Sequence, residues 1–560
     1  MKRLRAVTAA LLLTLELCLG AMASPARAAS IADSGRDNDH ITWTLARDGT
    51  LTVYGTGEVD SYIDLTDTSY KSWKRLHKDD VKRVVVENGI TEISGYAFCQ
   101  LSNLVTVTIP ASVTKIEGSA FSYDNRLNNI IVDADNPAYQ SVNGVLFDRS
   151  QTELCAYPMG KKETSYSVPS GITSVGNYAF RDNTALASVD LPAGVVNIGE
   201  YAFSGCTSLT SMNLPSSVAR IGEGAFGRCS ALTSVNISSS VKSIGTRAFA
   251  NTALKSVNLP SGMTKIEDGV FSECVSLRDV NLPDSITSIG AGAFMECASL
   301  TDMNISAGVT NIGTAAFAGA GLTAITVDPG NKTYRSVDGV LFSYDQKNLH
   351  SYPSGKKAIE YSVPSGTTSI RDGAFGLCEN LAKINIPIGV THIGRAAFSG
   401  CTKLTAMNLP DGLTSISEYL LSDCTALKNV TIPLSVTCIE SQAFARTGLK
   451  DIRIPSSVRK IGEGTFAGCA SLDSVVLPSG LTRIESWALG GCPKLRSVYI
   501  PASVKEIVKE AFTGCTNLKD VYYAGTASQW NQVIIRPENN PLFAATLHCN
   551  HAAPSMGAAK

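Results

Sequence analysis

The chain has 560 residues, of which 17% are charged and 44% are hydrophobic, and its formal net charge is −1. A chain this apolar and this weakly charged is not expected to be disordered, and it lacks the basic excess that nucleic-acid binding requires. Only six histidines are present, which also disfavours a multi-histidine metal centre and histidine-based catalysis.

Residues 1–28 have the pattern of a secretory signal peptide. Basic side chains at Lys2, Arg3 and Arg5 precede an apolar run, and an Ala-Arg-Ala triplet at 26–28 supplies the small residues that signal peptidase reads. A permanent membrane anchor is the alternative, but an acidic residue inside the run would be costly in a bilayer. No second stretch of about 20 apolar residues follows. We therefore expect a secreted or extracellular protein, retained or not at the cell surface, whose mature chain does not span a membrane.

The next segment, residues 29–83, is predicted to form an N-terminal β cap. Its stretch WTLARDGTLTVYGTGEVDSY, residues 43–62, alternates apolar and polar side chains around Asp48-Gly49. An Asp-Gly pair between two alternating runs is a strong signal for a β-hairpin turn. We expect this hairpin to cover the first coil of the repeat array that follows.

A repeated motif dominates the rest of the chain. Each copy contains one large apolar residue, here called the plug, which usually follows a small residue. Most successive plugs are 22 or 23 residues apart, with two longer intervals of 59 and 58 residues. A fixed period in the twenties is typical of a repeat solenoid, in which each coil packs only against its neighbours. Leucine is the plug at Leu421 and Leu489, and the phenylalanine plugs, all expected in the core, are Phe98, Phe121, Phe180, Phe203, Phe226, Phe249, Phe271, Phe294, Phe317, Phe375, Phe398, Phe444, Phe466 and Phe512.

The period at residues 209–231, LTSMNLPSSVARIGEGAFGRCSA, illustrates the expected layout of one coil. LxxMxL alternates with period two and predicts a short strand, which Pro215 should end because proline has no N–H to donate. A second short extended segment is expected over residues 218–221, followed by a turn at Gly222. The Ala-Phe pair is then expected to place the plug in the core from a short helical turn.

The two long intervals contain the same module, used twice. Residues 132–167 and 327–362 share the pattern VDxxNxxYxSVxGVLF…YPxGKK, and we expect each module to form irregular coils within the stack. The modules divide the array into blocks of leucine-rich coils, which are followed by a C-terminal cap and tail. The predicted blocks are 84–131, 168–326 and 363–520, and the cap and tail are 521–560.

The repeat LxxVxIPxSVxxIGxxAFxxCxx, with the inserted NxxYxSVxGVLF, resembles the BspA-like, or treponemal-type, leucine-rich repeats of bacterial secreted and surface proteins. The resemblance covers residues 84–523, and VYYAGTASQWNQV at 521–533 is similar to the motif that closes such arrays. It implies a right-handed, mostly β superhelix that mediates adhesion or another protein–protein interaction, and the lack of catalytic motifs described below predicts that the protein is not an enzyme. The implied partner is a protein ligand, such as a host extracellular-matrix or cell-surface protein. The alternative is a structural spacer or envelope scaffold without a dedicated ligand.

Ten cysteines stand three residues after a plug, and two interpretations compete. The favoured one is a small apolar residue buried in a tight turn. A ladder of disulfides is the alternative, disfavoured because stacked coils would hold neighbouring Cβ vectors parallel instead of facing. No CxxC pair occurs, which removes the usual zinc and redox signatures. The ten are Cys206, Cys229, Cys274, Cys297, Cys378, Cys401, Cys424, Cys469, Cys492 and Cys515.

No catalytic residue, cofactor or metal site is predicted, since GxSxG and P-loop patterns do not occur in the sequence. Two patterns leave alternatives. His548-Cys549-Asn550-His551 could be half of a metal site, although it lacks further ligands. The polar clusters of the inserted modules could bind calcium, but they lack the spaced carboxylates of an EF-hand and are better interpreted as turn formers. These clusters are Asp133, Asp135 and Asn136, and Asp328 with Asn331.

One position of each predicted strand points outward between two inward residues. It is asparagine in seven coils, where we expect a ladder of hydrogen-bonded side chains: Asn213, Asn236, Asn258, Asn281, Asn304, Asn385 and Asn408. Toward the C-terminus the position becomes Thr431, Arg453, Val476, Tyr499 and Tyr522. Tyrosine and arginine are favoured at protein contacts, so the candidate protein-binding surface is Arg453, Tyr499, Tyr522 and Tyr523. The alternative for Tyr523 is that it seals the last coil together with Trp530.

Overall fold

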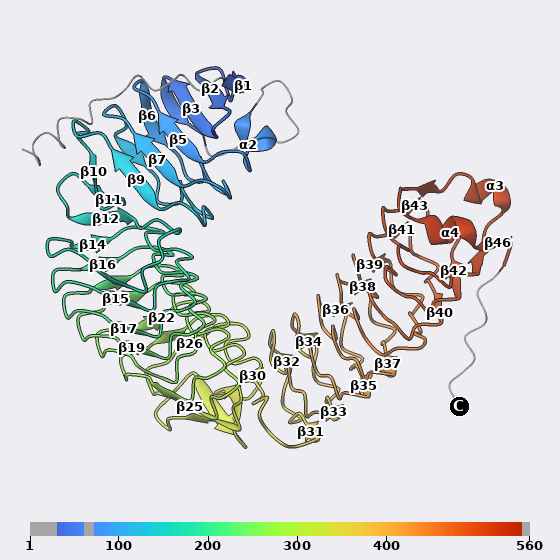
Figure 1. Ribbon diagram of the computed structural model, residues 1–560. Coiled ribbons are helices and arrows are strands. Elements are labelled where there is room, and N and C mark those ends of the chain that lie inside the picture. Colours follow the sequence, from blue (N-terminus) through green and yellow to red (C-terminus); the bar gives the residue numbers. More distant parts are fainter. Residues whose placement is uncertain (1–30, 61–71, 552–560) are drawn as a thin grey trace, which may run out of the picture. The chain divides into compact units, whose positions relative to one another are not determined.

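The computed structural model describes residues 31–60 and 72–551 (Figure 1). The predicted signal peptide, residues 1–28, lies outside the described residues. The described chain forms two compact units, in which nearly all the regular elements are short β-strands joined by turns. The first unit comprises the residues up to 163 together with 171–183, and the second comprises 164–170 together with the residues from 184 onward.

The first unit begins with the predicted hairpin, which covers the first coil. β2 (Ile41–Ala46) and β3 (Thr50–Gly55) pair antiparallel around Gly49, whose φ of +88° is a conformation that suits glycine. β1 (Ile31–Arg36) adds an antiparallel strand outside β2. On its other edge β3 pairs in parallel with β5 (Arg83–Val86), so the hairpin leads directly into the stack of coils.

The coils of the first unit extend this sheet and add a second one. β5 continues in parallel through β7 (Thr106–Ile109) to β9 (Asn129–Val132). Helix α2 (Trp73–Leu76) places the ring of Trp73 in the core against the rings of Trp43 and Phe98. The second sheet consists of β4 (Gly57–Val59), β6 (Ile90–Ile93) and β8 (Lys115–Ile116).

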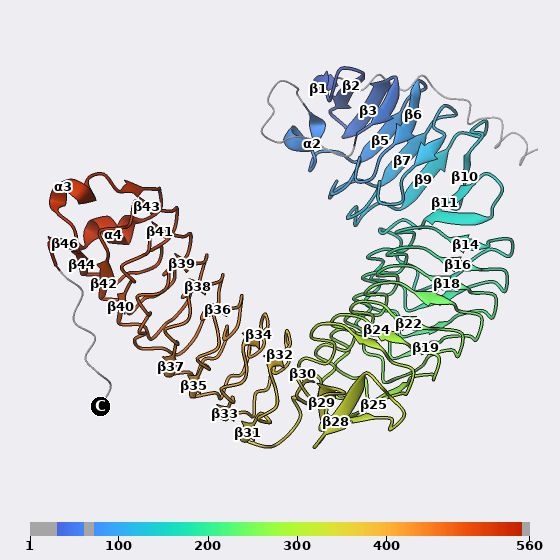
Figure 2. The ribbon, with the colours of Figure 1, turned by 180° about the vertical axis from the view of Figure 1, so that it is seen from behind.

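In the second unit, the two extended segments of each coil form two series of parallel strands (Figures 1 and 2). The first series comes from the LxxVxL part of the repeat. Its alternating burial puts Met212 inside and Asn213 outside, and neighbouring strands are in register, as in the pairing of Asn213 with Asn236. The series consists of β13 (Ser165–Ser167), β15 (Ser188–Asp190), β17 (Ser211–Asn213), β19 (Ser234–Asn236), β21 (Ser256–Asn258), β23 (Asp279–Asn281), β25 (Asp302–Ile305), β27 (Ala324–Val327), β31 (Glu360–Ser362), β33 (Lys383–Asn385), β35 (Ala406–Asn408), β37 (Asn429–Thr431), β40 (Ser474–Val476), β42 (Ser497–Ile500), β44 (Asp520–Tyr523) and β46 (Thr546–Cys549).

The second series comes from the SVxxIG part of the repeat, and its strands are two residues long. Each contributes an inward isoleucine or its equivalent, and neighbouring strands pair in parallel, as Ile221 with Ile244. The series consists of β16 (Asn197–Ile198), β18 (Arg220–Ile221), β20 (Ser243–Ile244), β22 (Lys265–Ile266), β24 (Ser288–Ile289), β26 (Asn311–Ile312), β32 (Ser369–Ile370), β34 (His392–Ile393), β36 (Ser415–Ile416), β38 (Cys438–Ile439), β39 (Lys460–Ile461), β41 (Arg483–Ile484), β43 (Glu506–Ile507) and β45 (Ile534–Ile535).

The plug segment differs from the short helical turn that the sequence predicts. It is a run of tight turns in which the residues two before and two after the plug are left-handed, as Gly224 (φ 56°) and Arg228 (φ 62°) are around Phe226. Two left-handed residues so close together exclude the continuous right-handed backbone of an α-helix. The backbone bonds to the next coil instead, and the Phe226 N–H donates to the Ala248 carbonyl at 2.7 Å. The helices among the described residues are α2, α3 (Ala527–Trp530) and α4 (Asn540–Ala544), and none of them is long and apolar enough to cross a membrane.

The plug side chains form an aromatic stack in the core. The phenylalanine plugs are all buried, with at most 7% of any of them exposed. From Phe203 to Phe317, successive ring centroids are 5.2–6.0 Å apart and the rings are within 17° of parallel. Such aromatic pairs contribute about 0.5–1.5 kcal/mol each beyond the burial of their area. Leu421 and Leu489 are equally buried where they replace the ring.

Each inserted module is a three-stranded antiparallel meander, where the sequence predicts irregular coils. The shared NxxY pattern ties the module to the preceding coil. Asn136 donates to two backbone carbonyls of that coil and Tyr139 Oη accepts from its backbone, and Asn331 and Tyr334 make the same bonds in the second module. The first meander, β10 (Tyr139–Val142), β11 (Val145–Asp148) and β12 (Glu153–Ala156), continues in parallel to β14 (Ser174–Val175), and the second, β28 (Tyr334–Val337), β29 (Val340–Ser343) and β30 (Asn348–Ser351), continues to β32.

The ten cysteines that follow the plugs are buried, and all fourteen cysteines among the described residues are free thiols. Sulfur atoms of these cysteines lie close to backbone carbonyl oxygens of the preceding coil. Cys229 Sγ is 3.0 Å from the carbonyl oxygen of Phe203, and Cys401 Sγ is 3.2 Å from that of Phe375. Burial raises the pKa of the Cys401 thiol to about 12, so the S–H remains protonated and donates this bond. The structure thus agrees with the buried-thiol interpretation.

Thiol titration should therefore separate the native protein from the denatured one. The denatured mature chain is expected to titrate close to fourteen thiols, whereas the native chain reacts slowly because the buried thiols are protonated. A reductant should leave the melting temperature unchanged. Several disulfides found by mass spectrometry of the purified protein would contradict this expectation.

Candidate protein-binding surface

Near the end of the second unit, the outward position of the strands carries stacked aromatic side chains. The sheet β40-β42-β44-β46 places Tyr499 opposite Tyr522, and Tyr522 opposite His548. Ring centroids are 4.5 Å apart for Tyr499 and Tyr522, and 4.7 Å apart for Tyr522 and His548. All three side chains are half-buried. We call Tyr499, Tyr522 and His548 the C-terminal aromatic column.

His548 joins this column because the chain returns to the sheet as β46, within the segment that the sequence analysis assigns to a cap and tail. His548 Nε2 lies 2.8 Å from Asp520 Oδ1, and the ring of His551 packs edge-on against Tyr522 at 5.4 Å. Residues 546–549 carry no repeat consensus, so no sequence signal marks this strand. The two histidines considered as half of a metal site are thus part of an aromatic cluster. Among the described residues, no group of three or more His, Cys, Asp or Glu side chains is arranged to hold a metal ion.

Tyr523 does not belong to the surface, and this prediction is corrected. Its side chain is fully buried and packs edge-on against the ring of Trp530 at 5.0 Å. Tyr522 and Tyr523 are consecutive in β44, and consecutive strand residues point to opposite faces of a sheet. The structure therefore agrees with the alternative, in which Tyr523 and Trp530 seal the last coil.

Arg453 lies at a break in the outward sheet and is not part of the column. It is joined to Val476 by a single β-bridge, and no strand pairing among the described residues joins its segment to β37. The break contains a groove of about 430 Å³ that is lined by Arg453, Thr431 and Leu434, and Leu434 is 79% exposed. Val476 pairs with Tyr499 and so stands between Arg453 and the column.

The outward asparagines of the central coils bond in part to one another. Asn236 Nδ2 donates to Asn213 Oδ1 at 3.4 Å, and Thr431 Oγ1 donates to Asn408 Oδ1 at 3.2 Å. Between these coils the outward polar side chains already hydrogen-bond to one another, which leaves fewer hydrogen-bonding groups for a partner. The predicted polar ladder is present at these positions and ends before the aromatic column begins.

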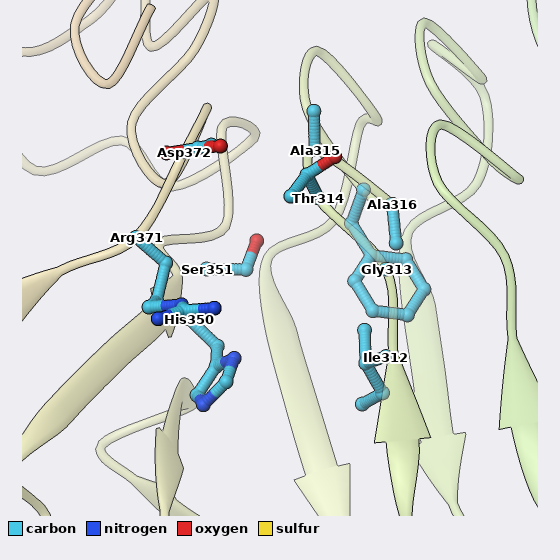
Figure 3. A pocket seen from close by; sticks show the side chains of 10 residues that line it. Ile312, Gly313, Thr314, Ala315, Ala316, His350, Ser351, Arg371 and Asp372 are labelled. Carbon is cyan, nitrogen blue, oxygen red and sulfur yellow. The ribbon is translucent and has the colours of Figure 1, made fainter. Parts of the chain in front are cut away.

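A small cavity lies between the second inserted module and the coils around it (Figure 3). His350, Ser351, Arg371 and Asp372 line one side, and residues 312–317 line the other. Its volume of about 20 Å³ is room for roughly one water molecule. Burial, together with the charge of Arg371, lowers the pKa of His350 to about 4, so this imidazole is neutral at pH 7. The cavity is too small to hold a substrate.

The polar clusters of the inserted modules act as turn residues. Asp133 Oδ1 accepts a hydrogen bond from the N–H of Asp135, and Asp328 Oδ1 accepts one from the N–H of Gly330. The amide group of Asn136 makes four bonds to backbone groups. These contacts are those of Asx turns, and they occupy the Asn136 oxygen that the calcium alternative needs as a ligand.

Several solved structures of bacterial repeat proteins are similar to this chain. The leucine rich cell surface protein of Faecalibacterium prausnitzii A2-165 is 24% identical, with a TM-score of 0.35, and the match covers 90% of this chain and 98% of that one. The pneumococcal vaccine antigen PcpA is 17% identical, with a TM-score of 0.41 and coverage of 94% and 99%. The leucine rich repeat protein of T. pallidum is 30% identical, with a TM-score of 0.29 and coverage of 32% and 86%. No curated protein matches the chain.

The repeat itself matches a known protein family over most of the chain. The family is described as "BspA type Leucine rich repeat region (6 copies)", and it matches residues 75–151, 156–278, 264–351, 351–464 and 439–534. These ranges contain all the plugs and most of both inserted modules. The protein therefore belongs to the BspA-type leucine-rich repeat family.

Proposed function

We propose that this protein is secreted or displayed at the cell surface, is not an enzyme, and binds a protein ligand through the C-terminal aromatic column. The observation that carries the proposal is the stack of Tyr499, Tyr522 and His548 on the outward face of the sheet. The signal-peptide pattern at residues 1–28 and the family membership support export. Host extracellular-matrix and cell-surface proteins are the candidate ligands.

The column suits a protein contact in both composition and rigidity. Tyrosine is enriched among the residues that contribute most to binding energy, because its ring offers a large apolar area with a polar tip. The stacking of the rings and the 2.8 Å contact between His548 and Asp520 hold the side chains in place before a partner arrives. Less side-chain entropy is then lost on binding, which strengthens the complex.

The groove beside Arg453 extends the same outward face. Arg453 is bridged to Val476, which pairs with Tyr499, so groove and column belong to successive coils. The exposed Leu434 and the guanidinium of Arg453 offer an apolar and a charged contact. We therefore place the partner contact mainly over residues 450–530, with Leu434 at its edge.

The structural spacer remains the second candidate function, and the central coils favour it. Their outward side chains bond along the stack, and ion pairs join neighbouring coils, such as Lys383 with Glu360 at 2.7 Å and Lys460 with Glu440 at 3.1 Å. Exposed pairs of this kind contribute only about 0–1 kcal/mol each. The outward polar side chains that take part in these bonds and ion pairs need no ligand.

Replacing both column tyrosines, Tyr499→Ser with Tyr522→Ser, is expected to weaken ligand binding by about 1 kcal/mol or more, roughly five-fold. The fold should persist because both rings lie outside the buried core. Residues 29–560 of this chain are first used to capture the ligand from host extracellular proteins. The affinity of that ligand for the variant is then measured by titration.

The matched control is Asn236→Ser with Asn258→Ser in the central ladder, which should be nearly silent for binding. If this control abolishes binding and the tyrosine pair does not, the asparagine ladder is the interaction face and the column is not. If residues 29–560 capture no host protein, the spacer function is favoured.

A further inference from the structure

A second cluster of tyrosines lies on the first unit, at backbone positions that favour glycine. The residues two before and two after a plug are left-handed around most plugs. In the second unit some of them are glycine, such as Gly224 and Gly292, and others are bulky, such as Tyr201 and Trp487. In the first unit the same positions carry Tyr96 (φ 60°), Tyr123 (φ 66°) and Tyr178 (φ 62°). A left-handed backbone is uncommon for a bulky residue, but it recurs around the plugs of both units. What distinguishes Tyr96, Tyr123 and Tyr178 is that all three contact Arg181.

The guanidinium of Arg181 holds these tyrosines together. Its Nη2 donates to Tyr123 Oη at 2.6 Å, and its carbon lies 5.1 Å from the ring centroid of Tyr123 and 5.3 Å from that of Tyr178. Tyr96 also hydrogen-bonds to the guanidinium. The carboxylate of Asp182 lies 3.3 Å from Nε and forms an ion pair with the group. Arg181 therefore contacts all three tyrosines and one carboxylate.

The hydrogen bonds of this cluster determine what it can recognise. Guanidinium N–H groups are donors only, so the oxygens of Tyr96 and Tyr123 accept from Arg181. Each phenol O–H hydrogen is then left to donate to another acceptor. Tyr96 is 38% exposed and Tyr123 is 39% exposed, and both contact the half-buried guanidinium of Arg181. Two neighbouring O–H donors backed by a cation match the two oxygens of a carboxylate, because hydrogen bonds to an ionised acceptor are the stronger ones.

We propose that Tyr96, Tyr123 and Arg181 form a binding site for a carboxylate side chain, aspartate or glutamate, of a protein partner. The site rests on the proposed function only in that its ligand is a protein, and it shares no residue with the C-terminal aromatic column. It would give the chain a second, independent contact with its partner.

The surroundings favour a single carboxylate over a polyanion such as a sulfated polysaccharide. Arg181 is the one cation in the cluster, and Asp182 already offsets part of its charge. The exposed Glu117 adds a negative charge nearby, because its carboxylate accepts at 2.7 Å from the N–H of Gly95, the residue before Tyr96, and pairs with Lys115 at 3.8 Å. The cavity beside Tyr178 and Arg181 has a volume of about 20 Å³, so the ligand remains at the surface.

The test uses two blocked peptides as probes, one with four glutamates between glycines and one in which glutamine replaces each glutamate. Residues 29–560 are titrated with each probe by calorimetry. We expect the glutamate peptide to bind about ten-fold more tightly or better, the scale of one charge-assisted contact. The double variant Tyr96→Phe with Tyr123→Phe removes only the two hydroxyls and should reduce this ratio to about one.

Two controls separate this site from other effects. Tyr344→Phe removes a hydroxyl from an exposed tyrosine that also stacks with an arginine, Arg335 at 5.6 Å, and should leave the ratio unchanged. Tyr499→Ser with Tyr522→Ser should also leave the ratio of the two peptide affinities unchanged. A failure of the column proposal can therefore be distinguished from a failure of this site. Equal binding of both peptides, or an unchanged ratio in the double phenylalanine variant with an unchanged melting temperature, overturns the site. If heparin binds at these residues and the glutamate peptide does not, the carboxylate site is also overturned, and a glycan is the ligand.

Discussion

Replacing Phe226 by alanine is expected to destabilise the middle of the second unit by about 3–5 kcal/mol. The Phe226 ring is fully buried and stacks between Phe203 at 5.2 Å and Phe249 at 5.3 Å. Its removal leaves a cavity and breaks two aromatic contacts. Because each coil of a solenoid is coupled only to its neighbours, the loss should be largest in the coils that contain these three rings.

Hydrogen exchange followed by mass spectrometry measures this directly. Amides within two coils of Phe226 should exchange faster in the variant, while those near Phe466 should keep their protection. Arg220→Ala in the same coil is the matched control, because its side chain is exposed and its contact with Glu200 is a 4.0 Å surface pair. Unchanged exchange around residue 226 would show that the plug does not hold the stack together.

The second large effect is expected at Asp124, a buried acid in the first unit. It occupies the position three residues after its plug, where most coils have cysteine, and its side chain is fully buried. Burial raises the pKa of this carboxyl to about 9, opposed only by a bond from the N–H of Leu101 at 2.8 Å. The folded protein therefore holds this proton at neutral pH, whereas the unfolded chain releases it above its ordinary pKa of 3.8.

This difference sets the sign of the pH dependence. Between pH 3.8 and about 9 the folded state binds one more proton than the unfolded state, so stability falls as the pH rises through that window. Asp124→Asn removes the titration and keeps an acceptor for Leu101. Asn183 occupies the equivalent position in another coil and donates to the Tyr157 carbonyl at 3.2 Å. We expect the variant to stabilise the first unit by about 3–5 kcal/mol at pH 8 and to differ little from the natural protein near pH 4.

Denaturation of both proteins at pH 4, 6 and 8, with hydrogen exchange of residues 98–130 as the local readout, checks this expectation. Asn183→Asp is a useful counterpart, because it should introduce the same loss of stability at pH 8. If the natural protein is equally stable at pH 6 and pH 8 and Asp124→Asn brings no gain, Asp124 is ionised in the folded state and its interpretation as a buried neutral acid is wrong.

The sequence alone was sufficient for the repeat, the fold class and the N-terminal hairpin. These features depend on local geometry. They are the alternation in LxxMxL, the strand end at Pro215, and a plug such as Phe226 that recurs every 22 or 23 residues. In a solenoid each coil meets only near copies of itself, so one period predicts the environment of all the others. The hairpin was predictable for the same reason, because the turn at Gly49 and the strands beside it are close in sequence.

Only the tertiary structure decided the features that depend on residues far apart in the sequence or on the backbone around the plug. The left-handed turns at Tyr96 and Tyr123 could not be predicted because tyrosine does not signal a left-handed backbone and no glycine stands there. Tyr523 is buried because α3 brings Trp530 over it, and His548 reaches the column through a strand without repeat consensus. Arg181 meets Tyr123 across 58 residues because the first inserted module separates two coils that stack on each other. The periodicity of the sequence predicts the contacts between regular repeats. The contacts of Arg181, Tyr523 and His548 are made where the repeat is interrupted, so the periodicity does not predict them.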